Sequence, residues 1–554
     1  MPANELRSTR TFERASRAGT PAGPDTARDM LSDPMAQRLS GNARRPNIIF
    51  IVTDDQRYDT LALVDPTTGE PWMSKTLRWF GGTRDAHGNP VSTEFTNAFP
   101  TTPLCCPSRA SIMTGKYAHN HGVHGNFDKD NLDQTTTLQH YLKSQPSPYH
   151  TGVFGKYLNN WVSSGGNPPK NPPDFDEWAI FDNGVLYSQT PAPPCPDPHG
   201  FLGVNCVNDQ GELGQTPPNV YEPTYLAKKA ADFIRSRAAD PDTPWFLYVA
   251  TTVPHSPYRP EPRYARIPVP DPHMNESNSP EADVSDKPPY VQFQRERAEA
   301  FLRSDPSTWP TGGKGADVST DGLQGWSECI FNKIRPSQLR MLKSADDMVD
   351  QIFTTLEQTG QADETLAFYT SDHGFMWNEH GLVEKPHPYY EMRVPMFMRW
   401  PNHVTTTMDP SLVANIDMMP TALAATGVPI PATVDGHDLL APNREPRDLL
   451  LLERVPRWAS VVSMAGDQYT EYYYPDLSPE LWSDQYPVRD DSPPGTPVRE
   501  YYDLRADPLQ LRNLLHDGET GDPSEDRLRT LERQLADARN SAGRGGVAGR
   551  PGSP

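Results

Sequence analysis

The sequence predicts an α/β fold in which helices sandwich a large, mostly parallel β-sheet, followed by a smaller C-terminal α+β domain. Short apolar runs typical of buried strands alternate along the chain with segments of helical period, as in layered α/β domains. The chain has 554 residues, of which 35% are apolar, so it is long enough to bury a large core. No internal repeat is present that would favour a solenoid or a propeller.

Four apolar runs predict strands of the sheet, and two amphipathic segments predict helices between them. The strands are expected at 47–53, 151–154, 245–253 and 365–370, and the helices at 224–239 and 337–358. The apolar side chains of the second helix recur at helical spacing: Leu339, Leu342, Met348, Val349, Ile352, Phe353 and Leu356. Stretches rich in proline, glycine and asparagine predict long loops at 163–222 and 256–320.

Composition divides the chain into four parts. Residues 1–45 are rich in Arg, Ala, Pro, Ser and Asp and predict a disordered leader. Residues 46–442 hold the alternating strands and helices and form the main domain, which also carries the candidate site residues. Residues 443–540 predict the smaller C-terminal subdomain, which ends in a charged helix near 525–539. Residues 541–554 are expected to form a flexible tail.

The charge balance narrows the range of partners. There are 51 Lys and Arg against 72 Asp and Glu, a formal net charge of −21, so general nucleic-acid binding is not expected. No apolar stretch approaches the roughly 20 residues of a membrane span, and no membrane partner is expected. Because no signal peptide is visible, we expect a cytoplasmic protein, although a misassigned start codon would leave export open.

Acidic residues follow two of the predicted strands directly. Asp54 and Asp55 come after the first strand, and Asp372 and His373 come after the fourth. Open α/β sheets bind ligands outside the carboxyl ends of their strands, so we expect these four side chains at one edge. Carboxylate oxygens suit calcium or magnesium, whereas the softer His373 would also admit manganese or zinc.

A second candidate segment runs from Pro103 to Gly115 and contains adjacent cysteines. Cys105 lies just before a predicted helix, since Pro107 is favourable in a first helical turn. A helix N-terminus favours negative charge, and Arg109 on the next turn adds a cation. These residues alone fit either an acidified catalytic thiol or a structural cysteine. The chain has five cysteines, too few for a disulfide framework, although Cys195 and Cys206 could pair.

The segment resembles the sulfatase motif C-x-P-S-R followed by A-x-x-x-T-G, with Cys105 at the first position and Cys106 at the variable one. The continuation from Lys116 to Val123 resembles the N-acetylglucosamine-6-sulfatase branch. The resemblance implies an alkaline-phosphatase-like fold, a bound calcium ion, and oxidation of Cys105 to formylglycine. It also implies a formylglycine-generating enzyme as the partner for maturation.

Further blocks that resemble the family occur in family order. The resemblance implies that Asp54, Asp55, Asp372 and His373, together with residue 105, hold the metal. It implies that Lys156 and Lys385 bind sulfate, and that His255 lies on the substrate side and protonates the leaving alcohol. Taken singly, such residues are also ordinary turn acids, solvated lysines or loop histidines.

One position departs from the pattern of arylsulfatases, which carry a histidine two residues after the first lysine. Leu158 stands there and cannot take up a proton. His387 is the favoured replacement because it lies two residues from Lys385, and His121, Asn159 or water are the alternatives. The Lys-Tyr-Leu-Asn form is also expected of the N-acetylglucosamine-6-sulfatase branch, so it does not indicate inactivity.

Together these residues predict a sulfatase, a sulfuric ester hydrolase that acts on a sulfated small molecule or oligosaccharide. Two alternatives stay open. One is a phosphonate or phosphate ester hydrolase of the same superfamily. The other is a non-catalytic binding homologue in which Cys105 stays a thiol.

Overall fold

The computed structural model describes most of the chain from Arg44 onward. The described residues are 44–161, 171–182, 185–188, 205–207, 213–215, 221–256, 258–270, 284–288, 291, 333–385, 387–389, 392–473, 497–516 and 522–543. The predicted leader, apart from its last two residues, lies outside these ranges, as does Cys195 and with it the suggested pairing to Cys206.

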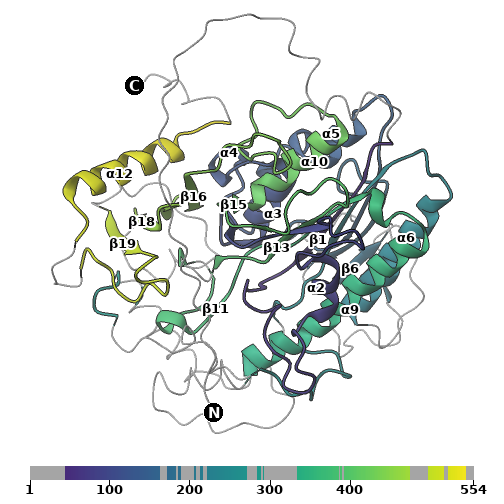
Figure 1. Cartoon of the computed structure of the whole chain (residues 1–554), viewed down its shortest axis with the longest axis horizontal. Coiled ribbons are helices and arrows are strands. Elements are labelled where there is room, and N and C mark those ends of the chain that lie inside the picture. Colours follow the sequence, from purple (N-terminus) through teal and green to yellow (C-terminus); the bar gives the residue numbers. More distant parts are fainter. Residues whose placement is uncertain are drawn as a thin grey trace, which may run out of the picture. The chain divides into compact units, whose positions relative to one another are not determined.

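An eleven-stranded sheet forms the centre of the molecule (Figure 1). In spatial order its strands are β14 (Met408–Asp409), β2 (Ser92–Phe95), β13 (Met396–Arg399), β10 (Thr365–Ser371), β1 (Asn47–Thr53), β9 (Trp245–Ala250), β4 (His150–Gly155), β5 (Glu177–Asp182), β6 (Val185–Ser188), β7 (Asn205–Val207) and β8 (Leu213–Gln215). The four strands predicted from apolar runs are β1, β4, β9 and β10, which are neighbours in parallel pairing.

Strand β1 shows why these segments read as continuous apolar runs. Its residues from Ile48 to Val52 are fully buried, because helices cover both faces of a parallel sheet. Ile49 and Ile51 pack into one hydrophobic cluster, whereas Ile48, Phe50 and Val52 pack into another on the opposite face. The alternation of side chains along the strand divides one apolar run between two cores.

Helices cover each face of the sheet (Figure 1). One face carries α2 (Ser74–Phe80), α6 (Glu222–Ala238) and α9 (Arg335–Gln358), and the other carries α3 (Cys105–Thr114), α4 (Ala118–His121), α5 (Leu138–Lys143) and α10 (Met418–Thr426). The predicted helices are thus α6 and α9, whose apolar faces are buried as expected. None of the described helices is long and apolar enough to span a membrane.

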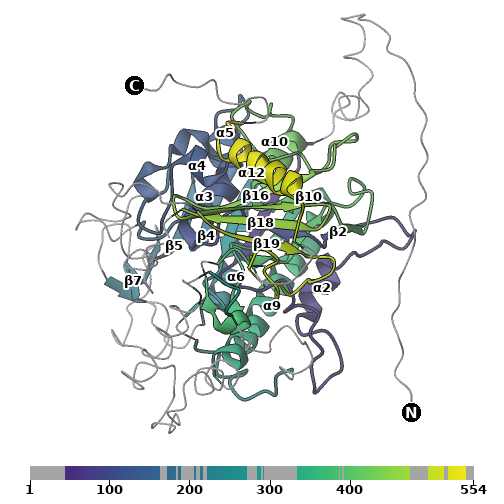
Figure 2. The same cartoon turned by 90° about the vertical axis from the view of Figure 1, so that its left-hand side faces the viewer.

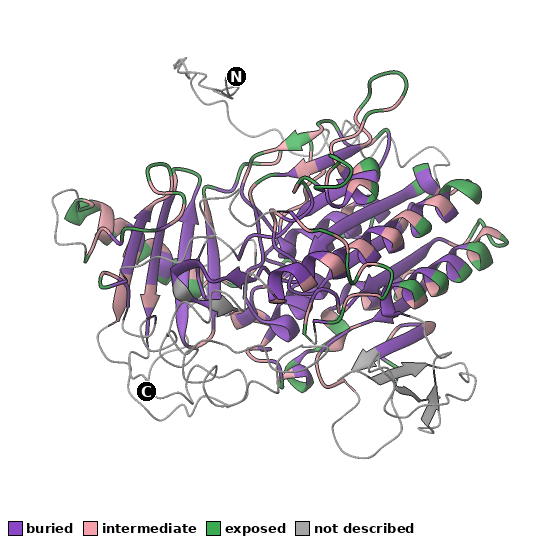
Figure 3. Cartoon of the chain, turned by 90° about the horizontal axis from the view of Figure 1, so that it is seen from below, coloured by how far each residue is buried: buried purple, intermediate pink, exposed green. Residues whose placement is uncertain are grey.

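A second, antiparallel sheet follows near the C-terminus, with α12 (Glu525–Arg539) packed against it (Figure 2). Its strands, in order, are β16 (Leu449–Arg454), β17 (Trp458–Ser463), β18 (Asp467–Tyr472) and β19 (Val498–Asp503). Two-stranded pairs complete the structure: β3 (Ala98–Phe99) with β15 (Val413–Ala414), and β11 (Met376–Trp377) with β12 (Val383–Glu384). In the main sheet β1, β9 and β10 are largely buried, as are the strands of the second sheet (Figure 3).

The fold class predicted from the sequence is confirmed, but the expected loop at 163–222 is wrong in part. Strands β5 to β8 lie within it and extend the main sheet beyond β4. β5 pairs in parallel with β4, whereas β7 and β8 have only three residues each. Strands this short are held by backbone hydrogen bonds to a neighbour, and they are too short to show a periodic apolar pattern.

Candidate active site

Three strands of the main sheet end beside one another and bring the predicted acids together. β1 and β10 are in register with Thr53 opposite Ser371, so the residues that follow each strand leave at the same edge. The amide of Asp372 donates to the carbonyl of Thr53 at 3.0 Å, and the amide of Asp54 donates to the carbonyl of Val253 at 3.2 Å. The loops after β1, β9 and β10 are therefore fastened to each other.

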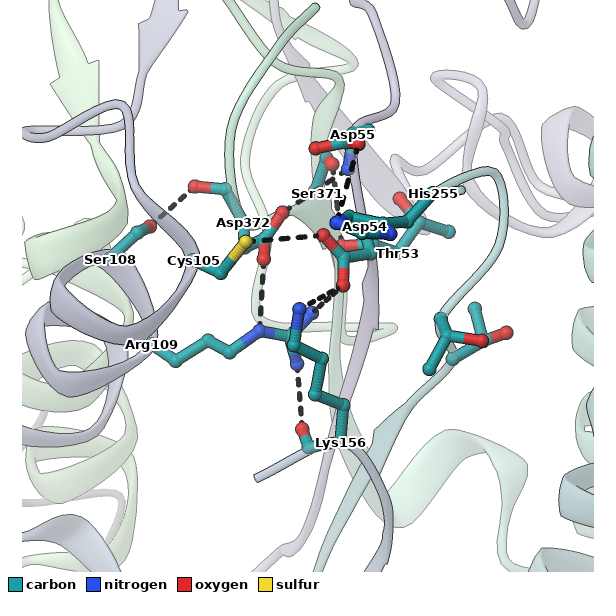
Figure 4. Close-up of polar contacts among 12 residues, drawn as sticks. Thr53, Asp54, Asp55, Cys105, Ser108, Arg109, Lys156, His255, Ser371 and Asp372 are labelled. Carbon is teal, nitrogen blue, oxygen red and sulfur yellow. Dashed lines mark hydrogen bonds and ion pairs between the residues drawn. The ribbon is translucent and has the colours of Figure 1, made fainter. Parts of the chain in front are cut away.

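Helix α3 presents Cys105 to this edge from its first turn (Figure 4). The Oγ of Ser108 donates to the carbonyl of Asp372, and the amide of Cys106 donates to Oδ1 of Asn126 at 3.0 Å. The first bond fixes the start of the helix against the β10 loop, and the second fixes it against the segment after α4. The Sγ of Cys105 then lies 3.3 Å from Nζ of Lys385 and 3.3 Å from Nε2 of His373.

Four of the five predicted metal-binding residues form one compact, buried group. Asp54, Asp55, Cys105 and His373 each offer a ligand atom, and these atoms lie within 4.8 Å of one another. Asp372 borders the group: its Oδ2 accepts from Nε of Arg109 at 2.9 Å, and its Oδ1 accepts from the amide of His373 at 2.9 Å.

The donor set fits a hard divalent cation. The two carboxylates of Asp54 and Asp55 are almost fully buried, at 0% and 3% exposure, with a third carboxylate alongside. Buried carboxylates at this spacing repel one another unless cations neutralise them. Oxygen-rich sites of this kind suit calcium or magnesium, and the imidazole of His373 widens the choice.

Three basic side chains converge on the same carboxylates. Nζ of Lys156 lies 2.5 Å from Oδ2 of Asp54, and a guanidinium nitrogen of Arg109 lies 3.4 Å from the same oxygen. Nζ of Lys385 lies 2.6 Å from Oδ1 of Asp55. Burial alone would raise the pKa of Asp54, but Lys156, His255 and Arg109 hold it well below its usual range. The site therefore offers several positive groups around the Cys105 sulfur.

The same charges separate the two adjacent cysteines. Burial and Asp54 oppose ionisation of Cys105, yet Lys156, Lys385 and His373 hold its pKa well below the usual value of a thiol. Cys106 belongs to the hydrophobic core on the face of the sheet that α3 covers. Burial raises the pKa of its thiol to about 12. The geometry thus favours Cys105 over Cys106 as the reactive residue.

His255 approaches the site from the loop after β9. Its Nε2 lies 3.9 Å from Oδ2 of Asp55, and its Nδ1 lies 2.6 Å from the carbonyl of Ser256. Burial disfavours the charged form, but Asp55, Asp54 and a hydrogen bond with Cys105 raise the pKa of His255 to about 9. This shift favours the protonated imidazole, which is the form that a proton donor needs.

Sequence reasoning missed Glu222, which holds the His255 loop. This carboxylate at the start of α6 accepts from the amide of Thr252 at 3.0 Å, from its hydroxyl at 2.8 Å and from the hydroxyl of Thr251 at 3.0 Å. The amide of His255 donates in turn to the carbonyl of Thr252 at 2.9 Å. Burial raises the pKa of Glu222 to about 7. An acid that opens an amphipathic helix looks like an ordinary helix-start residue in the sequence, so no sequence signal marked it.

The structure argues against both histidines considered as replacements at Leu158. His387 is buried, and burial together with Arg454 and His380 lowers its pKa to about 3. Arg454, which ends β16, is close enough to His387 for its charge to contribute to this lowering. His121 lies 3.0 Å from the hydroxyl of Ser111, and burial lowers its pKa to about 3. Leu158 itself is a fully buried member of the core.

With this geometry in place, comparison with known proteins identifies the family. The family model named Sulfatase matches residues 46–428. The chain belongs to the sulfatase family. Over 520 residues it is 27% identical to human N-acetylglucosamine-6-sulfatase, covering 86% of this chain and 82% of that protein. The predicted family is confirmed, and this relative supports the predicted likeness to the N-acetylglucosamine-6-sulfatase branch.

The chain spans less than half of the length of two other sulfatase relatives. The chain is 29% and 30% identical to extracellular sulfatase homologues of Drosophila melanogaster and Caenorhabditis elegans, of which it spans only 32% and 48%. BT4656, solved in complex with its substrate D-glucosamine-2-N,6-O-disulfate, shares the fold at a TM-score of 0.59, with 20% identity over 90% of this chain and 98% of that one. A phosphonate monoester hydrolase from Silicibacter pomeroyi shares it at 0.60, with 19% identity over 89% and 95%.

Proposed function

We propose that this sulfatase-family protein hydrolyses sulfate esters of sulfated sugars, with a nucleophile derived from Cys105. The observation that carries the proposal is the position of the Cys105 sulfur, 3.3 Å from both Lys385 and His373 at the edge where Asp54 and Asp55 emerge. The sugar substrate is supported by the relatives, which are named for N-acetylglucosamine-6-sulfate or were solved with a sulfated glucosamine.

Two groups that the chain does not encode belong to the proposal. Formylglycine, formed from Cys105 by a formylglycine-generating enzyme, supplies a hydrated aldehyde whose hydroxyl is the nucleophile. Asp54, Asp55, Asp372 and His373 would hold a calcium ion, which when bound would supply positive charge beside residue 105. The buried carboxylates and the adjacent imidazole support that assignment of ligands.

The basic side chains of the site provide for the charge of the sulfate group. Lys156, Lys385 and Arg109 surround the position of Cys105 and would neutralise sulfate oxygens as negative charge shifts toward the leaving group. Arg109 is fixed for this task, because its guanidinium also donates to the carbonyl of Lys156 at 2.6 Å. His255, whose Nε2 lies 3.9 Å from Oδ2 of Asp55, would donate a proton to the departing alcohol.

The role of His255 predicts a dependence on the leaving group. Replacing His255 with glutamine should slow hydrolysis of a sugar sulfate about a hundredfold, since an alkoxide is a poor leaving group without a proton. Hydrolysis of p-nitrophenyl sulfate, whose leaving group needs no proton, should fall far less. Equal losses for the two esters, measured as kcat/KM, would contradict the role of His255 as the acid.

The same residue predicts the direction of the pH dependence. The protonated form of His255 is populated below its pKa of about 9, so kcat/KM for a sugar sulfate should decline as pH rises toward that value. A dication on Asp54 and Asp55 would weaken their pull on the proton, so the decline should begin below pH 9 in the metal-loaded enzyme. His255→Gln should remove this alkaline limb.

A phosphonate or phosphate ester hydrolase is the second candidate, because a phosphonate monoester hydrolase shares the fold. Sulfate and phosphonate monoesters with the same p-nitrophenyl leaving group separate the two candidates. We expect the sulfate ester to be turned over with the higher kcat/KM, and release of sulfate from N-acetylglucosamine-6-sulfate to be detectable. Much faster turnover of the phosphonate would replace the first candidate with the second.

A further inference from the structure

Tyr389, four residues after Lys385, links the Lys385 segment to the C-terminal sheet by a hydrogen bond. Lys385 contacts Asp55 and the Cys105 sulfur, at 2.6 Å and 3.3 Å. Four residues further on, the hydroxyl of Tyr389 donates to Oε1 of Glu500 at 2.9 Å. Glu500 belongs to β19 of the second sheet, so one short segment joins that sheet to the candidate active site.

Glu500 is a fully buried carboxylate whose donors are tyrosines from three parts of the chain. Besides Tyr389, it accepts from Tyr502 at 2.7 Å and from Tyr472. A buried carboxylate is held firmly when several donors share its oxygens. Tyr472 and Tyr502 come from β18 and β19 and tie Glu500 within its own sheet, whereas Tyr389 alone of these three comes from the Lys385 segment.

Neighbouring contacts limit how far the segment can move. Nε2 of Gln468 on β18 donates to the carbonyl of Pro388, and the amide of Met392 donates to the carbonyl of Tyr389 at 3.0 Å. Pro388, which directly precedes Tyr389, has its φ angle fixed by its ring. Only three residues separate Tyr389 from Lys385, so a displacement of Tyr389 is expected to reach Lys385.

We propose that Tyr389 is a positioning residue that, through its hydrogen bond to Glu500, holds the Lys385 ammonium where it binds the sulfate group. The inference rests on the proposed function only in taking Lys385 as a sulfate-binding group. It gives the C-terminal sheet a part in the active site: the sheet supports a side chain that touches substrate. Residues 385 and 500 are far apart in sequence, and the tyrosine is the link between them.

Three single substitutions test this link, because each removes one hydroxyl from the same carboxylate. Tyr389→Phe should weaken binding of inorganic sulfate, measured by calorimetry on the metal-loaded protein, and raise KM for p-nitrophenyl sulfate, each by about tenfold. Tyr472→Phe and Tyr502→Phe are matched controls and should change both values by less than about twofold. All three should shift the melting temperature to a similar extent.

A double-mutant cycle with Lys385→Ala isolates the route of the effect. If Tyr389 acts through Lys385, adding Tyr389→Phe to Lys385→Ala should cause no further loss of sulfate binding. Equal losses in the three tyrosine variants, or a full effect of Tyr389→Phe in the Lys385→Ala background, would overturn the positioning role while leaving the sulfatase proposal intact. A wild-type protein that neither binds sulfate nor hydrolyses sulfate esters would overturn both.

Discussion

Replacing Cys105 with alanine is expected to lower kcat/KM for sulfate esters by at least about a thousandfold, because it removes the precursor of the nucleophile. The Cys105 sulfur lies at the meeting point of Lys385, His373 and Asp54, so no nearby side chain can take its place in the same geometry. Steady-state kinetics with p-nitrophenyl sulfate measures the loss, and a melting curve shows whether the variant remains folded.

Cys106→Ala is the matched control for this prediction. Cys106 is fully buried in the core, so its truncation should cost about 1 kcal/mol of stability and leave turnover within a few-fold of wild type. Burial raises the pKa of the Cys106 thiol to about 12, which disfavours the reactive thiolate at neutral pH. A larger loss of activity in Cys106→Ala than in Cys105→Ala would reverse the assignment of the two residues.

Removal of the metal is expected to lower activity and stability together. The ligand atoms of Asp54, Asp55 and His373 lie within 4.8 Å of one another, and both carboxylates are buried. Without a cation between them, the two carboxylates repel each other. A cation bound only by the folded protein stabilises it by about 2.7 kcal/mol at a hundred times its Kd. Chelation should therefore abolish turnover and lower Tm by several degrees, and calcium should restore both.

Asp55→Asn provides the control for chelation. It removes one ligand charge, so its Tm should respond little to either chelator or calcium. A fully chelated wild-type protein with unchanged kcat/KM and unchanged Tm would contradict the metal site. Restoration by zinc or manganese but not by calcium would keep the site and change the ion, as the imidazole of His373 permits.

The part of the site that the sequence predicts is the part built from strand ends. Asp54 and Asp372 each follow an apolar run, and parallel pairing of β1 with β10 brings such residues to one edge. The placement of Cys105 at the start of a helix likewise follows from Pro107 and the charged turn after it. These are local signals combined with one general rule of sheet topology.

The features that the sequence does not predict depend on contacts between distant segments. Tyr389 and Glu500 are 111 residues apart, and neither belongs to a pattern that points to the other. Proximity in sequence also misled: His387 is two residues from Lys385, yet its side chain lies by Arg454 of the second sheet. The described residues between Lys385 and Tyr389 belong to no helix or strand, so closeness along the chain does not fix the direction of a side chain there.

The most direct test of the central claim is the mass of the tryptic peptide that contains residues 105 and 106, taken from a preparation that hydrolyses p-nitrophenyl sulfate. Conversion to formylglycine replaces the thiol sulfur with an aldehyde oxygen and removes two hydrogens, and fragmentation assigns that change to one residue. We predict that residue 105 carries the aldehyde and that residue 106 remains cysteine. An active preparation in which residue 105 is an unmodified thiol, or in which the aldehyde is at residue 106, would contradict the claim.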